Sequence, residues 1–447
     1  MFTAPDNSTA AGSPAGEAQA AAALYHFLKM RIEVDCERQD VFVNGSNTLK
    51  QDGRWYPYIW HEYSHYLQNF CTTIGISITI NWVAVMVQFA KAHANGNTLI
   101  VPTFKDPTNP FNAQYKSFLD QVNELIGLQV ELDTNPPASA VPFSLYGEDS
   151  FAADVFLCLA EESGKKVGVP LIGDAFFEGI SQATQWLAEG HVVWDDTLLQ
   201  ARNVADKDVY YHGLIRFFRH HFPNTNPCYP MVALGNLCLL TRSPGHFFRY
   251  VFEQHQQNGV PSAPDQWLDL RRRYGELGYV KEGVDFASAR VNEFIDQQRA
   301  RPVNALTPVW NAMANTMRTG IEMQRSQPEL LCVFNPTGRA LVDLAQTLGF
   351  PPLFTRNIDS GFGLAGHADL RSFCFLGHAA FELIDGLYRD GLIAECSFLH
   401  TRICNFRKGS HCKYDRLNLP EVDGHYCIMG AVAQSLGING RACKKLP

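Results

Sequence analysis

The spacing of apolar positions changes along the N-terminal part of the chain. Residues 31–35 and 40–44 alternate apolar and polar side chains, as short, half-buried strands do. From Trp55 onward the spacing becomes that of a helix. Its apolar stripe consists of Ile59, Tyr63, Leu67 and Phe70. The pattern predicts a small sheet near the start and a mainly helical α+β fold overall.

The stretch from Tyr66 to Ala90 contains no formal charge and is long enough to span a bilayer. Hydroxyl and amide side chains interrupt it, however, and so does Gly75. We favour buried elements of a soluble protein over membrane insertion. The expected elements are a helix ending near Gly75, a strand-like stretch at 76–80, and a second helix from Asn81 to Gly96.

Helical spacing recurs in the later stretches 113–126, 149–162, 174–189, 209–221 and 287–300. Residues 1–20 are rich in Ala, Gly, Ser and Pro, which predicts a disordered tail. A boundary is expected near Arg301-Pro302, because six of the twelve cysteines lie between Cys374 and Cys443. The chain would then consist of the tail, one domain at 21–300 and a Cys-rich C-terminal module at 301–447.

Composition and charge exclude some functions. The 447 residues are 46% hydrophobic and 18% charged, which is typical of a folded protein. A net charge of −8 provides no basic face, so nucleic-acid binding is not expected. The N-terminus lacks the positive start of a secretory signal, which favours a cytoplasmic location. Cysteines in the cytoplasm are expected to be thiols or metal ligands.

The predicted helix after Trp55 contains the sequence His61-Glu62-Tyr63-Ser64-His65. Two histidines four residues apart lie on one helix face, so both rings can bind one metal ion at roughly 2.0–2.1 Å. Glu62 is rotated about 100° from His61, which places it beside the metal. A zinc ion lowers the pKa of its bound water from about 15.7 to about 7, and an adjacent carboxylate can then act as general base.

A catalytic zinc ion needs a third protein ligand. Residues 176–182, Phe-Phe-Glu-Gly-Ile-Ser-Gln, open a second helical stretch. Together with the first motif, this Glu-Gly helix resembles the gluzincin group of zinc metallopeptidases. The resemblance implies a zincin-like fold for 21–300, Glu178 as the third ligand, and a small residue after it that lets the two helices approach. Other candidate ligands are Glu148, Asp154, Glu161, Glu162 and Asp174.

Some 112 residues separate His65 from Glu178, whereas many gluzincins have a few tens. An insertion or lid at 97–170 would account for this spacing. In gluzincins a Tyr or His that follows the glutamate helix often stabilises the oxyanion. The resemblance thus indicates Tyr211 or His212, which open a helical stretch, with His220 and His221 as further candidates. Asp174 or Asp154 could orient the histidines.

The C-terminal cysteines offer a possible second metal site. Cys396, Cys404 and Cys412 recur every eight residues, and Cys427 follows. Thiolates with nearby imidazoles can hold a structural zinc ion, but the short Cys-x₂₋₄-Cys spacing is absent. Buried reduced cysteines and disulfides are the alternatives.

These observations predict a zinc metallopeptidase that acts on a protein or peptide substrate. The sequence is also compatible with a regulatory partner of the enzyme. The same site could instead hydrolyse a non-peptide amide or an ester. A different class is an inactive metallopeptidase-like scaffold that binds or regulates other proteins, although the intact Glu62 argues against it. An effector-type protease that acts on one host protein would also fit.

Overall fold

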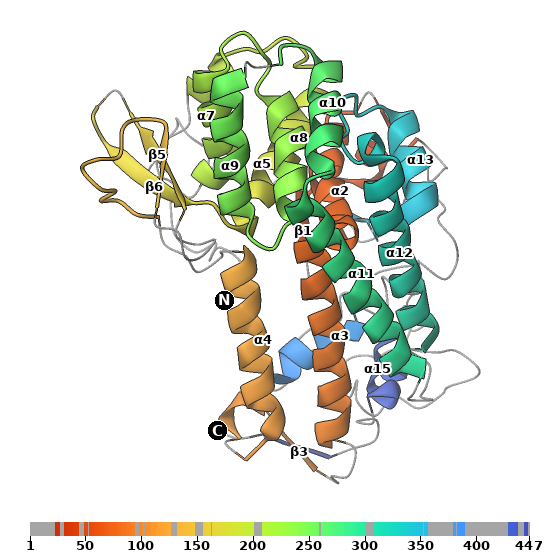
Figure 1. Ribbon diagram of the computed structural model, residues 1–447. Coiled ribbons are helices and arrows are strands. Elements are labelled where there is room, and N and C mark those ends of the chain that lie inside the picture. The colour runs from red at the N-terminus through yellow and green to blue at the C-terminus, as the bar shows by residue number, and fades with distance from the viewer. Residues whose placement is uncertain are drawn as a thin grey trace, which may run out of the picture.

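The computed structural model describes residues 23–26, 31–43, 49–51, 53–93, 98–101, 103–106, 108–126, 132–147, 155–161, 163–200, 208–258, 261–299, 307–351, 353–355, 379–380, 382–388, 428–436 and 442–445. Its architecture is mainly helical, with small sheets at the periphery (Figure 1). This α+β class agrees with the sequence pattern. The predicted tail at 1–20 lies outside the described residues.

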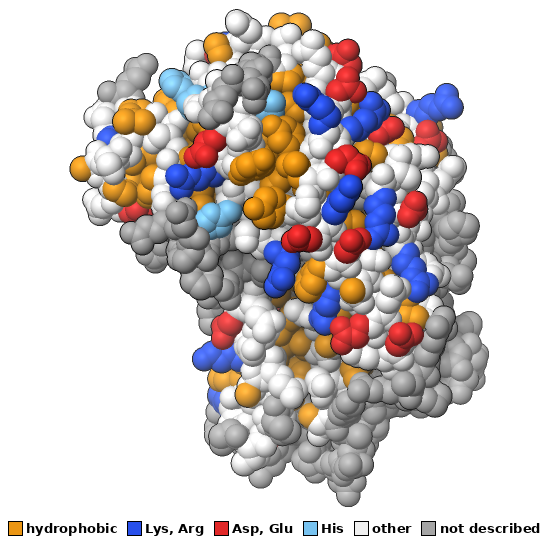
Figure 2. Space-filling model, viewed as in Figure 1, with side chains coloured by type: hydrophobic (Ala, Val, Ile, Leu, Met, Phe, Trp, Pro, Cys, Tyr) orange, Lys and Arg blue, Asp and Glu red, His pale blue; other side chains and the backbone are white. Residues whose placement is uncertain are grey.

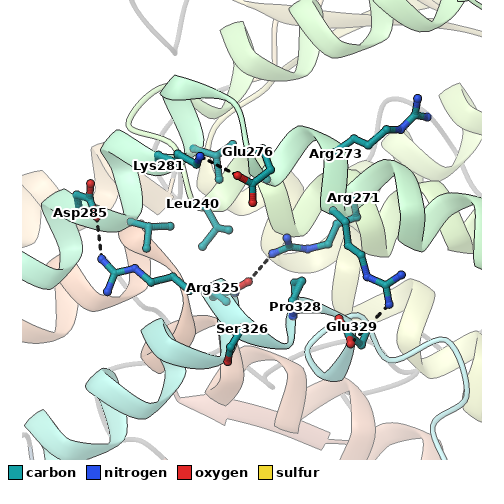
Figure 3. Close-up of a pocket in the computed structure, with 15 residues that line it drawn as sticks. Leu240, Arg271, Arg273, Glu276, Lys281, Asp285, Arg325, Ser326, Pro328 and Glu329 are labelled. Carbon is teal, nitrogen blue, oxygen red and sulfur yellow. Dashed lines mark hydrogen bonds and ion pairs between the residues drawn. The ribbon is translucent and has the colours of Figure 1, made fainter.

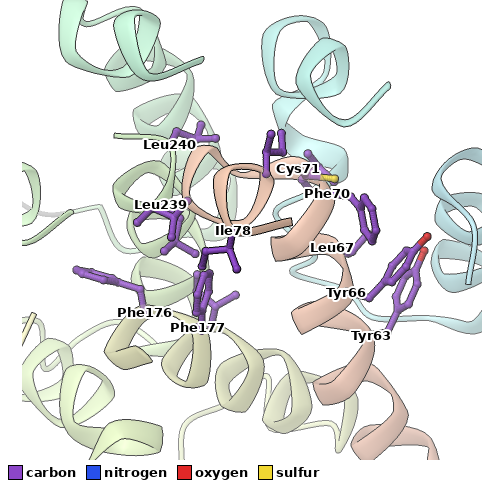
Figure 4. Packing of buried hydrophobic residues seen from close by; sticks show 14 of the residues in the cluster. Tyr63, Tyr66, Leu67, Phe70, Cys71, Ile78, Phe176, Phe177, Leu239 and Leu240 are labelled. Atoms are coloured by element: carbon purple, nitrogen blue, oxygen red, sulfur yellow. The ribbon is translucent and has the colours of Figure 1, made fainter. Parts of the chain in front are cut away.

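Helix α2 (Tyr56–Cys71) lies at the centre of the fold. Pro57 is in its first turn, where the missing N–H of proline costs no hydrogen bond. Fourteen of its sixteen residues are buried. Other elements therefore surround α2 on nearly all sides, and it has no broad face exposed to solvent. It packs against helix α5 (Gly173–Ala188) and against helix α12 (Thr307–Ser326). Figure 4 shows the apolar side chains of α2 and α5 that fill the surrounding core.

The polar atoms of α2 are satisfied by distant parts of the chain. The stacked rings of Tyr63 and Tyr66 have centroids 5.6 Å apart. The Tyr63 hydroxyl donates to the carbonyl of Gly349 at 2.9 Å, and the Tyr66 hydroxyl donates to the carbonyl of Leu348 at 2.8 Å. These two bonds anchor α2 to the C-terminal end of helix α13 (Gly338–Leu348).

Helix α3 (Thr73–His93) follows α2 after a bend of 76°. The strand-like stretch predicted at 76–80 is wrong, and so is the predicted helix start at Asn81. The isoleucines at alternate positions give a strand-like sequence pattern, because α3 is buried on several sides and apolar residues are therefore not confined to one helix face. The intervening hydroxyls are satisfied within the helix, since Ser77 donates to the carbonyl of Thr73 and Thr79 donates to the carbonyl of Gly75.

Within the described residues, no single helix is long and apolar enough to cross a membrane. The bent pair of α2 and α3 passes the same test of length and composition when the two are taken together. Both helices contribute large buried side chains to the core, including Trp60 and Trp82.

Three small sheets are present in the described part of the chain, at the periphery of the helices. Strand β2 (Arg31–Val34) lies between antiparallel β1 (Ala23–His26) and parallel β7 (Leu353–Thr355). Strands β4 (Ser144–Tyr146), β5 (Phe156–Ala160) and β6 (Lys166–Pro170) form an antiparallel sheet that leads directly into α5. The third sheet pairs β3 (Thr98–Val101) with β8 (Ala442–Lys445) in parallel.

The remaining helical elements are α1 (Arg38–Val41), η1 (Thr103–Lys105), α4 (Pro110–Ile126), α6 (Thr197–Gln200), α7 (Val209–His221), α8 (Cys228–Leu239), α9 (Pro244–Asn258), α10 (Pro264–Gly275), α11 (Gly278–Arg299), η3 (Pro328–Leu330) and α15 (Ile428–Ser435). Helices predicted at 113–126, 174–189, 209–221 and 287–300 are confirmed by α4, α5, α7 and α11. In Figure 1, α3 runs beside α4 and α11, and α11 runs beside α12.

Two further predicted elements differ from the structure. The strand expected at 31–35 is present as β2, but the first two residues of the strand expected at 40–44 belong to the short helix α1, and Phe42 forms only a single antiparallel bridge with Leu49. There the backbone N–H of Glu37 donates to the Asp40 carboxylate, a local bond that favours a helical turn. The helix expected at 149–162 is contradicted by β5, whose short apolar run pairs with β6. Such runs do not distinguish strand from helix by periodicity.

The predicted boundary at Arg301-Pro302 and most of the predicted C-terminal module lie outside the described residues. Helix α12, which follows that boundary, packs on both α2 and α11. The division of the chain at this point therefore stays a prediction.

The bend between α2 and α3 depends on Gly75. A Cβ atom at this position would lie 2.1 Å from the carbonyl oxygen of Gln68, so the two helices could not keep their contact. We expect Gly75→Ala to lower the free energy of unfolding by about 2 kcal/mol or more, measured by urea denaturation. Gly278→Ala is the control, because its Cβ would meet no atom closer than 4.0 Å. Equal stability of Gly75→Ala and wild type would contradict this account of the bend.

Candidate metal centre

His61, His65 and Glu178 form one buried cluster between α2 and α5. The Nε2 atoms of His61 and His65 lie 3.5 Å and 3.4 Å from the same Glu178 oxygen, Oε2. The three ligand atoms all lie within 4.8 Å of one another. A zinc ion with bonds of about 2.0–2.1 Å separates its tetrahedral ligands by about 3.3 Å. The two separations from Glu178 are close to this value, and the group could therefore hold a metal ion of this kind.

The burial of the cluster also fits a cation. The side chains of His61, His65 and Glu178 are 8%, 11% and 20% exposed. Glu178 Oε2 is buried without a hydrogen-bond partner, and so is His61 Nδ1. Buried carboxylate oxygens are costly to leave unpaired. A cation held by Oε2 and the two Nε2 atoms would remove that cost for Glu178.

Gln68 holds the His65 ring in the orientation that a metal ligand needs. The Gln68 side-chain N–H₂ donates to the carbonyl of Phe177 on α5 at 3.1 Å, so its oxygen faces His65. His65 Nδ1 then donates to this oxygen at 3.0 Å, with Ser181 Oγ 3.3 Å from the same nitrogen. In the neutral ring, Nδ1 carries the proton and Nε2 presents its lone pair to the metal position.

Sequence reasoning missed Gln68 and proposed Asp174 or Asp154 for this orienting role. Asp154 lies outside the described residues. Asp174 is buried near the start of α7, where its charge helps raise the pKa values of Tyr210 and Tyr211. Gln68 could have been identified from the sequence, because it lies three residues after His65 and therefore on the same helix face.

The charges in the cluster are strongly coupled. Burial lowers the pKa of His65, but the carboxylate of Glu178 more than offsets this effect and the pKa rises to about 9. Burial raises the pKa of Glu178, but the positive charges of His65 and His61 hold it well below its ordinary value. In the absence of a metal ion, a proton on His65 therefore balances the Glu178 carboxylate.

Tyr211, from the first turn of α7, lies beside the cluster. Its ring stacks on His61 with a centroid distance of 5.9 Å and an interplanar angle of 28°. The Tyr211 residue is 37% exposed, so one side of it faces solvent. The charge of Glu178 raises the pKa of Tyr211 most, followed by burial and the charge of Glu62. The phenol consequently keeps its proton at neutral pH and can donate a hydrogen bond.

The other predicted catalytic residues occupy different environments. Glu62 is buried on α2, and its charge acts on both His65 and Tyr211. His212 is only 1% exposed and lies in the interior face of α7. His220 stacks on Phe143, and His221 contacts the carbonyl of Phe143, so both belong to the contact between α7 and the loop before β4.

Gly179 contacts a different helix from the one that was predicted. We expected Gly179 to let the glutamate helix approach the histidine helix. It instead faces α8, where a Cβ atom would lie 3.0 Å from the side chain of Met231. The close approach of α5 to α8 fixes the rotation of α5, which in turn directs Glu178 toward α2.

Across the described residues, no second group of three metal-binding side chains is present. Of the alternative third ligands, Glu148, Asp154 and Glu162 lie outside the described residues, while Glu161 and Asp174 are not part of the cluster. The predicted structural zinc ligands Cys396, Cys404, Cys412 and Cys427 also lie outside them. Six described cysteines, Cys71 among them, are buried and form no disulfide.

Comparison with known proteins adds no relative. No protein-family model, curated protein or solved structure matches this chain. The function of the protein is therefore inferred from the geometry and chemistry of the cluster.

The coupled charges predict how pH affects the metal-free protein. The pKa of His65 in the folded state, about 9, lies above its ordinary value of 6.5. Stabilisation by the His65–Glu178 pair is therefore complete below pH 6.5 and is lost as the pH rises through 9. The lowered pKa of Glu178 keeps this carboxylate charged throughout that range. We expect the free energy of unfolding after chelation to fall by about 2–3 kcal/mol over this interval.

Urea denaturation of chelator-treated protein at a series of pH values measures this effect. In Glu178→Gln the free energy of unfolding should change little between pH 6.5 and 9, because His65 no longer has a negatively charged partner. If the wild type and this variant lose stability equally, the pair does not carry the effect.

The position of Gln68 predicts its effect on metal affinity. We expect Gln68→Ala to weaken zinc binding by about 10- to 100-fold, because His65 loses the contact that orients its ring. Competition with a chromophoric chelator measures the affinity. Gln185→Ala is a matched control, since Gln185 is also a buried glutamine but bonds to Glu189 at the end of α5. Equal affinities in both variants would exclude an orienting role.

Proposed function

We propose that this protein is a zinc-dependent peptidase of the gluzincin type. The observation that carries the proposal is the convergence of His61 Nε2, His65 Nε2 and Glu178 Oε2 at distances that fit one zinc ion. The His-Glu-x-x-His helix and the later glutamate helix supply these atoms, as the sequence resemblance implies. Two imidazoles and one carboxylate are a donor set found in catalytic zinc sites.

Zinc bound here would polarise the scissile carbonyl and lower the pKa of the attacking water. Glu62, one step along α2 from His61, accepts the proton of that water and later delivers it to the leaving amine. Tyr211, whose phenol stays protonated beside Glu178 and Glu62, donates a hydrogen bond to the developing oxyanion. Tyr211 is favoured over His212 for this role because its ring contacts His61 and is partly exposed.

Peptide bonds are the proposed substrate because the resemblance is to peptidases. The same groups could hydrolyse a non-peptide amide or an ester, since the site chemistry does not select the acyl group. An inactive scaffold is disfavoured because Glu62, the residue that would act as general base, is retained and buried, and its charge acts on His65 and Tyr211 beside the cluster. A cytoplasmic location, a protein or peptide substrate and a regulatory partner belong to the same proposal.

The first test is the metal content of the full-length protein, measured by mass spectrometry. We expect at least one zinc ion per wild-type chain and one fewer in His65→Ala, because the site loses a ligand. His191→Ala is the control: His191 also lies 3.4 Å from a glutamate, Glu189, but outside the cluster. A zinc ion that persists in His65→Ala would have to bind elsewhere, and Cys404→Ser would then test the C-terminal cysteines.

Identical metal content in wild type and His65→Ala would contradict the site. So would the absence of zinc from wild-type protein purified without chelator.

The second test separates catalysis from metal binding. We expect Glu62→Gln to retain zinc and to lose activity by roughly 10²- to 10⁴-fold, because the general base is removed. Tyr211→Phe should retain zinc and lower kcat by roughly 10- to 1,000-fold through loss of the oxyanion donor. New N-termini released from a peptide library provide the measurement. Full activity in Glu62→Gln would exclude the mechanism.

A further inference from the structure

A cavity lies apart from the histidine cluster, between α10, α11, α12 and the end of α8. Its volume is about 600 Å³, which is in the range of small-molecule sites. Figure 3 shows charged side chains from α10, α11 and α12 around it, and both charge signs gather over these helices on the surface in Figure 2.

Each carboxylate that lines the cavity already has a cation as partner. The three ion pairs are Lys281–Glu276 at 2.7 Å, Arg325–Asp285 at 2.7 Å and Arg272–Glu329 at 3.6 Å. These pairs lie at the exposed rim, where side chains exchange partners at little cost. Two further arginines of the lining, Arg271 and Arg273, are in none of these pairs.

Arg271 differs from the other cations because it is buried, with 1% of its surface exposed. Its guanidinium donates to the side-chain oxygen of Gln324, a neutral group, and its Nε atom has no hydrogen-bond partner. Among the described residues, no carboxylate lies within ion-pair distance of it. The Cys332 side chain and the more distant charge of Glu329 offset only part of the effect of burial, which lowers the pKa of Arg271. A buried guanidinium without a carboxylate in direct contact is costly, and such groups are normally paired.

The space beside Arg271 is kept open by Gly275. A Cβ atom on Gly275 would lie 3.2 Å from Arg271 Nη1, so any side chain there would press on the guanidinium. Both residues line the cavity. In Figure 3 the guanidinium of Arg271 points inward, whereas that of Arg273 points away.

We propose that this cavity binds a small molecule with an oxyanion group, a carboxylate or a phosphate, through Arg271. The planar guanidinium matches either group with two parallel hydrogen bonds. The ligand supplies a counter-charge in direct contact with Arg271, whereas the charge of Glu329 acts on Arg271 from beyond ion-pair distance. Lys281 and Arg325, at the rim, are positioned to contact further acidic groups of the same ligand.

The cavity adjoins the C-terminal end of the histidine helix but is a separate site. The Gln324 N–H₂ that completes the contact of Arg271 donates to the carbonyl of Cys71, the last residue of α2, at 2.9 Å. The hydroxyl of Thr73 donates to the carbonyl of Leu240 in the cavity wall at 2.8 Å. The proposed ligand therefore binds behind α2, independently of the metal.

Calorimetric titration of the full-length protein with inorganic phosphate and with succinate tests the proposal, against sodium chloride at matched ionic strength. His65→Ala protein is titrated in parallel, which removes anion binding at a zinc ion. We expect saturable binding of at least one anion in both proteins. Preference for phosphate or succinate then identifies the oxyanion. Binding of neither anion above the chloride control overturns the proposal.

Two kinds of variant locate the binding. Arg271→Met should weaken it at least tenfold, because a charged hydrogen-bond donor is lost. Ser326→Glu places a carboxylate at the exposed rim and should weaken binding several-fold, whereas Ser326→Gln, of the same size, should not. If Arg271→Met fails to fold, the comparison of Ser326→Glu with Ser326→Gln is sufficient to test the location of the site. Unchanged affinity in Ser326→Glu and in a folded Arg271→Met would place the anion elsewhere and exclude this site.

Discussion

The contact between α2 and α5 is the constraint on which the candidate metal centre depends. Two of its ligands come from α2 and the third from α5, so a small slip of one helix would separate the donors. Gln68 opposes such a slip, because it bonds to a backbone carbonyl of α5 while it holds His65. On its far side α5 packs against α7 and α8, where Gly179 and Gly235 leave room for Met231. The position of Glu178 is thus set by helices that carry no ligand.

The charge balance of the cluster explains how a buried carboxylate is tolerated with and without metal. In the metal-free protein, Glu178 is balanced by a proton on His65. A zinc ion would occupy the place of that proton and bring the positive charge with it. Binding would then release the proton, which makes metal affinity depend on pH. The neighbouring phenol of Tyr211 stays neutral because the carboxylates of Glu178 and Glu62 disfavour a further negative charge.

The parts of this picture that were predictable from sequence are those that depend on local spacing. His61 and His65 share a helix face, and α5 and α7 show clear helical periodicity, so the elements that carry the cluster were expected. Gln68, the bonds of Tyr63 and Tyr66, and the pairing of β2 with β7 depend on contacts between distant residues, which periodicity does not encode. Helix α3 was misassigned in part because a helix buried on several sides has no polar face to reveal its period. The partner of Gly179 was wrong because helix packing angles are set by three-dimensional neighbours.

The long-range anchors of α2 have a consequence for how the protein is made. Residues 56–71 leave the ribosome early, yet the Tyr63 and Tyr66 hydroxyls bond to Gly349 and Leu348, and the Cys71 carbonyl accepts from Gln324. Strand β2 likewise cannot form its pairing with β7 until residues 353–355 have been synthesised. Contacts of such high sequence separation form late and slow the folding of a nascent chain. The two histidines are therefore translated long before the scaffold that aligns them exists, which delays assembly of the site until most of the polypeptide has emerged.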